Sequence, residues 1–176
     1  MDIGLLLLRL LLAAVLFAHG TQKALGWFQG PGPKGAEALF DKLGQHPPRT
    51  KVRLAVVCEL TAALLLGLGL ATPLGAAIAA GTMTVAGAAM SLLNRAFWNS
   101  AGGGEYPFVL AAAALCLGFT GPGAYSADAA LALWPADAIP GALAGPVVVV
   151  IAVVAAVPPV LATRRVQVRR AVPATY

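Results

Sequence analysis

Charged residues are scarce in this chain. Of its 176 residues only 11% are Asp, Glu, Lys or Arg, whereas an ordinary soluble domain carries about 25%. Hydrophobic residues make up 59%, and the mean hydropathy is +0.82. So few charges cannot cover a soluble enzyme, and this composition also excludes disorder and a coiled coil. The chain is therefore predicted to be an integral membrane protein.

Cysteine and histidine are equally rare. Cys58 and Cys116 form no CxxC pair, which excludes a disulfide scaffold and a zinc site. His19 and His46 are the two histidines, and His46 lies in a loop, so one chain cannot supply a bis-histidine haem site within the membrane. The run Gly102–Gly104 follows no predicted strand and is interpreted as a turn, not a phosphate loop. No metal or cofactor is evident from the sequence.

Long apolar runs, by contrast, are plentiful. A run of about 20 apolar residues can cross a bilayer as a helix. The pattern predicts an all-α polytopic membrane helix bundle with five spans, at about Ile3–Ala18, Val52–Leu70, Leu74–Leu93, Pro107–Thr120 and Ala142–Leu161. We expect residues 1–128 to form a four-helix core and residues 129–176 to add a further span with a basic tail.

The first loop is expected to contain a short amphipathic helix. Apolar residues recur at helical spacing between Ala36 and Leu43. Pro33 suits its start and Gly44 its end. Such a helix is expected to lie at the membrane interface or to fold back over the bundle.

The basic residues predict the topology. With five spans, the first loop, the third loop and the C-terminal tail share one side, while the other side has acidic residues and no Lys or Arg. The positive-inside rule then places the basic side in the cytoplasm of a bacterial-type cell and the N-terminus outside. On this interpretation the net charge of +5 indicates membrane orientation and not nucleic-acid binding. The basic set is Lys23, Lys34, Lys42, Arg49, Lys51, Arg53, Arg95, Arg164, Arg165, Arg169 and Arg170, and the acidic set is Asp2, Asp128 and Asp137.

Several short motifs along residues 3–128 resemble the DoxX/DoxD family of membrane proteins and occur in the same order as in that family. They are His19–Phe28 (HGTQKALGWF), Gly30–Gly32 (GPG), Glu59, Thr72–Pro73, Asn94, Phe97, Gly103–Pro107 (GGEYP), and Thr120–Gly123 (TGPG) followed by Tyr125–Ser126. The resemblance implies a four-helix membrane bundle and a link to quinone-reducing or oxidative-stress assemblies. Ser91–Leu93 stands where many members have a histidine.

Two charges interrupt the predicted spans, Arg9 in the first and Glu59 in the second. A charge inside a span is costly and usually faces the bundle or a partner. One interpretation is a buried ion pair or hydrogen-bond network that orders the bundle. The other is a proton-relay or quinone site.

A second polar group is predicted at the cytoplasmic mouth of the bundle. His19 and Lys23 lie four residues apart on one helix face, and the start of the fourth span should lie at the same depth. Histidine titrates near neutral pH and can transfer protons. The candidate ligand-binding or proton-relay residues are Arg9, His19, Gln22, Lys23, Glu59, Asn94, Glu105 and Tyr106.

These features lead to a functional hypothesis with alternatives. The chain is expected to be a DoxX-like subunit of a redox or oxidative-stress system, linked to a quinone or to a soluble or membrane redox partner. It carries no visible cofactor, so electron transfer would need such a partner. The alternatives are a non-catalytic scaffold or chaperone for other proteins, and a small-solute transporter built by oligomers. An oligomer is compatible with each hypothesis.

Overall fold

A computed structural model describes residues 1–132 and 141–171, and every regular element in these residues is helical. Asp137, which was expected on the outer side, lies outside them. The elements are α1 (Asp2–Leu25), α2 (Gly32–Lys42), α3 (Pro48–Leu68), α4 (Thr72–Asn94), the 3₁₀ turn η1 (Asn99–Ala101), α5 (Glu105–Thr120), α6 (Ala127–Ala130) and α7 (Gly141–Ala171).

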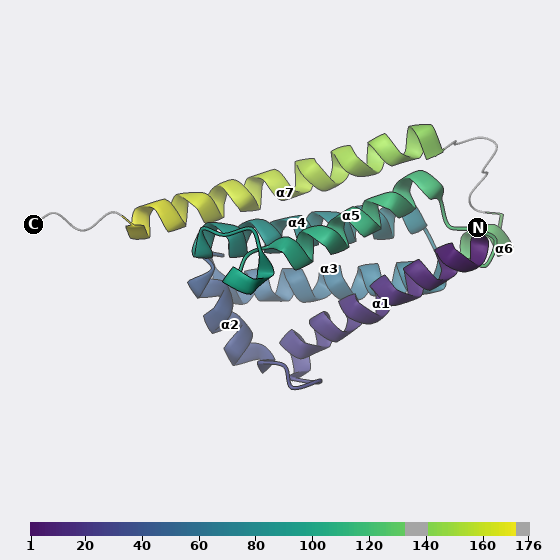
Figure 1. The fold of residues 1–176 in the computed structure, drawn as a ribbon. Helices are drawn as coiled ribbons and strands as arrows, with labels where there is room; N and C mark the ends of the chain where they lie inside the picture. The colour runs from purple at the N-terminus through teal and green to yellow at the C-terminus, as the bar shows by residue number, and fades with distance from the viewer. Residues whose placement is uncertain (133–140, 172–176) are drawn as a thin grey trace, which may run out of the picture.

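The five long helices pack side by side. α1 lies against α3, α3 against α4, and both α5 and α7 cover α4 (Figure 1). The start of α1, the α3–α4 turn and α6 lie at one end of the bundle, which we call the α6 end. The end of α1, α2, the α4–α5 loop and the last turns of α7 lie at the opposite end, which we call the α2 end. The chain thus begins at one end and α7 finishes at the other, as an odd number of passes requires.

The described helices have the character of membrane spans. Three of those in residues 1–132 and 141–171 are long and apolar enough to cross a bilayer, namely α1, α4 and residues 143–170 of α7. α3 has 21 residues but carries several charges near its start. α5 has 16 residues, about 24 Å of helix against a hydrocarbon core of about 30 Å. The prediction of a polytopic helical membrane protein is confirmed.

Two helices extend beyond the predicted spans. α1 continues past Ala18 to Leu25, so His19 and Lys23 belong to the helix. α7 continues past Leu161 to Ala171, so its arginines lie on a helix and not on an irregular tail. The apolar run stops at these two points, but the helices continue. No proline follows before the end of either helix, and α1 includes Gly20 without a break.

The short loop helix exists close to its predicted position, as α2. It packs against both α1 and α3. Ala36 is buried on its inner face. The predicted helix is therefore folded back onto the α2 end of the bundle.

Small residues on α4 and α5 allow α7 to approach closely. A Cβ built on Gly81 of α4 would lie 3.3 Å from the carbonyl oxygen of Ala152, and one on Gly118 of α5 would lie 2.9 Å from a methyl carbon of Val148. Close backbone approach through small residues is a common way to join membrane helices. These small residues therefore serve packing within one chain.

Close packing also explains the glycine run in the α4–α5 loop, because two of its positions leave no room for a side chain. A Cβ on Gly104 would lie 2.1 Å from the carbonyl oxygen of Gly87 on α4, and one on Gly103 would lie 2.3 Å from the carbonyl of Phe97. The run is a turn, as predicted, and it lies tightly against α4.

Candidate functional site

Lys23 and Glu59 form a buried ion pair between α1 and α3. Lys23 Nζ lies 2.8 Å from both carboxylate oxygens of Glu59, and the two side chains are 17% and 3% exposed. The same Nζ donates to the carbonyl oxygen of His19 at 3.1 Å. All three contacts lie toward the N-terminus of α1, which is the direction helical side chains favour. Lys23 therefore extends into the bundle instead of reaching out to the interface.

His19 and Tyr106 lie beside this pair. Their ring centroids are 6.0 Å apart with the planes tilted by 56°, which joins the end of α1 to the start of α5. His19 precedes Lys23 by one helical turn, on the same face of α1. The structure thus brings four of the candidates, His19, Lys23, Glu59 and Tyr106, to one place near the α2 end. We call them the polar cluster.

Gln22 supports the turn after α1. Its Nε2 donates to the carbonyl oxygen of Phe28 at 3.4 Å. A Cβ on Gly30 would lie 2.5 Å from the Cα of Gln22, so the loop backbone lies directly on this residue. Gln22 thereby positions the connection from α1 to α2.

Asn94 and Glu105 bind the backbone of the α4–α5 loop. Asn94 Nδ2 donates to the carbonyl oxygen of Gly102 at 2.7 Å. Glu105 accepts a hydrogen bond from the amide of Asn99 at 3.0 Å. Both side chains hold the turn between α4 and α5, and no described contact joins either of them to Glu59.

Arg9 lies at the opposite, α6 end and is only 1% exposed. Its Nη1 donates to the carbonyl oxygen of Leu66 at 3.3 Å, and its Nη2 donates to the carbonyl oxygen of Tyr125. Its Nε has no hydrogen-bond partner among the described residues. Arg9 and Glu59 are therefore not paired with each other, and each has its own partners at a different depth.

Asp128 completes the network at the α6 end, a role that sequence reasoning missed. Its carboxylate accepts the amides of Ala71 at 2.7 Å and Thr72 at 2.9 Å, and its own amide donates to the carbonyl oxygen of Gly69. It caps α4 although 56 residues separate it from Thr72. A nearby cap can be recognised by spacing, but so distant a cap has no local signal.

The two networks differ in their chemistry. Asp128 binds backbone amides at the start of α4, and Arg9 binds one carbonyl in the last turn of α3 and another just before α6. Both side chains therefore have a structural task. The polar cluster consists of side chains that can gain or lose a proton. No group of three His, Cys, Asp or Glu residues within the described ranges is close enough to hold a metal ion.

An apolar groove runs between α1 and α3 on another side of α1. Its volume is about 520 Å³. Phe17 lines this groove, and His19 lies two residues further on, roughly 200° around the helix. The groove and the rings of the polar cluster therefore lie on opposite sides of α1. The lining residues are Leu10, Ala13, Ala14, Phe17, Leu60, Ala63 and Leu64.

Comparison with known proteins gives one match. The model of the DoxX family matches residues 4–92, which is half of the chain. The match covers α1 to α3 and nearly all of α4, and it contains Arg9, His19, Lys23 and Glu59. No curated protein and no solved structure matched in the corresponding comparisons.

Proposed function

Because the chain belongs to the DoxX family, we propose that it is the membrane subunit of a redox system and that its polar cluster transfers protons for a quinone-linked reaction. The observation that carries the proposal is the Lys23–Glu59 pair, 2.8 Å apart inside the bundle, with the rings of His19 and Tyr106 alongside. Ionisable residues within membrane helices commonly mark proton or substrate pathways.

The chemistry of the cluster suits this role. Reducing a quinone requires two electrons and two protons, and a redox partner would supply the electrons. His19 and Tyr106 offer hydrogen-bond donors of the kind a quinone carbonyl accepts. Glu59 can hold a proton, and Lys23 balances its charge when the proton leaves. The proposed role of this chain is to bind and to transfer protons.

The proposed orientation places the cluster near the cytoplasm. The first and third loops and the last turns of α7, whose sequence contains the arginines, lie at the α2 end (Figure 1). The positive-inside rule favours the cytoplasmic side for this end and the outer side for the start of α1. We propose this arrangement, in which protons reach the cluster from the cytoplasmic side.

A double substitution separates a proton-transfer role from a purely structural one. Replacing a buried ion pair by apolar residues of similar volume often leaves a protein folded. Lys23→Met with Glu59→Leu should therefore fold but lack the titratable pair. In membranes where this variant replaces the wild-type chain, the rate of quinone reduction should fall at least tenfold. Lys34→Gln, at an exposed position on α2, is the control and should keep the wild-type rate.

The opposite outcome would assign the pair to structure. If the double variant is folded, is present at the wild-type level and reduces quinone at the wild-type rate, the proton-transfer role is wrong. The polar cluster would then serve only to hold α1 against α3.

A further inference from the structure

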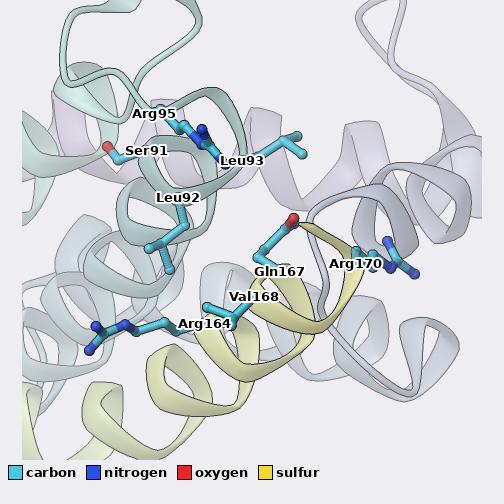
Figure 2. A pocket seen from close by; sticks show the side chains of 8 residues that line it. All are labelled: Ser91, Leu92, Leu93, Arg95, Arg164, Gln167, Val168 and Arg170. Carbon is cyan, nitrogen blue, oxygen red and sulfur yellow. The ribbon is translucent and has the colours of Figure 1, made fainter. Parts of the chain in front are cut away.

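A basic groove lies between the ends of α4 and α7, away from the polar cluster. Its volume is about 470 Å³. Figure 2 shows Arg95, just past α4, on one side and Arg164 of α7 on the other, with Leu92 between them. Leu93 and Val168 add further apolar lining. The groove thus combines cationic margins with an apolar floor.

Within residues 1–132 and 141–171, no acidic side chain balances the charges of Arg95 and Arg164. Neither Arg95 nor Arg164 forms a salt bridge within the described residues. Arg170 lines the groove too, but it donates to the carbonyl oxygen of Asp41 at 2.8 Å and lies 3.4 Å from its carboxylate. No acidic residue is among the described residues that line the groove. Two arginines are therefore available to an anion.

The depth of the groove indicates where that anion would come from. α4 ends at Asn94, immediately before Arg95, and the apolar run of α7 changes to arginines at Arg164. We therefore expect both helices to leave the hydrocarbon at this level, where the phosphates of the lipids lie. Basic pockets between membrane helices at this depth are suited to anionic headgroups.

We propose that this groove binds an anionic phospholipid. The phosphate would lie between Arg95 and Arg164, and an acyl chain would run along Leu92 and Val168. Arginine forms paired hydrogen bonds with phosphate oxygens, which favours it over a simple point charge. The lipid would fill the gap between α4 and the last turns of α7.

Binding to the full chain in nanodiscs tests the proposal. The chain is placed in phosphatidylcholine with a small fraction of cardiolipin, and the cardiolipin retained is measured by native mass spectrometry. Each arginine near the membrane surface should contribute about fivefold to binding, so Arg95→Gln with Arg164→Gln should weaken retention about thirtyfold. Arg165→Gln is the matched control for Arg164→Gln alone, because it removes one charge from the neighbouring, exposed position outside the groove.

Two results would overturn the proposal. One is equal loss of cardiolipin in the Arg164→Gln and Arg165→Gln variants, which would show general attraction to a basic surface. The other is displacement of cardiolipin by millimolar glycerol 3-phosphate, which would show a site for a soluble phosphate that needs no acyl chain. Melting temperatures in pure phosphatidylcholine establish that the variants remain folded.

Discussion

The Lys23–Glu59 pair should couple α1 to α3 strongly, and its energy can be worked from the structure. At the observed 2.8 Å, two unit charges attract by about 6 kcal/mol at an effective dielectric constant of about 20. Desolvation offsets much of this attraction, but removing one partner leaves the other charge buried. We therefore expect Glu59→Gln or Lys23→Met alone to cost about 3 to 5 kcal/mol, and the double substitution much less.

A double-mutant cycle measures this coupling directly. The free energy of unfolding is determined for the wild type, both single variants and the double variant by titrating the purified chain in mixed micelles with sodium dodecyl sulfate. The control cycle is the Glu37–Arg49 pair, in which the charged atoms are 3.8 Å apart and the side chains are 38% and 70% exposed. Screened by water, that pair should couple by less than about 1 kcal/mol.

The measured coupling energy shows whether Lys23 and Glu59 form a charged pair that is shielded from water. A value above about 2 kcal/mol for Lys23 and Glu59, with a much smaller one for the control, is expected for a buried pair. A value below about 0.5 kcal/mol would refute the argument, because it would mean that the carboxylate is neutral or hydrated where it lies.

Two further predictions concern the α6 end and the orientation of the chain. Gly69→Ala should destabilise the fold by more than about 2 kcal/mol, because its Cβ would lie 1.8 Å from Arg9 Nη1 and the backbone φ there is +64°. In the same unfolding titration, the control Gly4→Ala should have a stability near that of the wild type, since a Cβ there meets nothing within 4 Å. On a cysteine-free background, a membrane-impermeant maleimide applied to whole cells should label a cysteine at Ala130 and not one at Lys34, both exposed positions. The reverse labelling would invert the proposed topology, and a stable Gly69→Ala variant would contradict the close packing on Arg9.

The membrane helices could be predicted from the sequence because each one contains a long apolar run. Each of the five expected spans corresponds to a helix, since an apolar run long enough to cross a bilayer has few alternatives to helical structure. The ends of the helices were predicted less accurately than their positions. Arg164 and Arg170 were expected in a tail, but a helix can continue into water wherever no breaker stops it.

The partners of the intruding charges were not predictable. Sequence singled out Arg9 and Glu59 correctly as buried, and both are at most 3% exposed. It could not assign their contacts, because those depend on how side chains reach between helices. Lys23 pairs with Glu59 by extending inward, and Arg9 binds two backbone carbonyls, which have no sequence signature.

α7 covers a face of α4 and α5 that would otherwise be exposed to the lipid. Gly81 and Gly118 fit against it and are hidden from the lipid, while α7 presents large β-branched side chains such as Val150 and Val154 outward. Because α7 covers the small residues of α4 and α5, the face that the bundle presents to the lipid on this side consists of large β-branched side chains. A chain shortened before Gly141 would expose the small residues of α4 and α5. Helix faces made of small residues tend to pair, so this chain should tend to associate with a second copy.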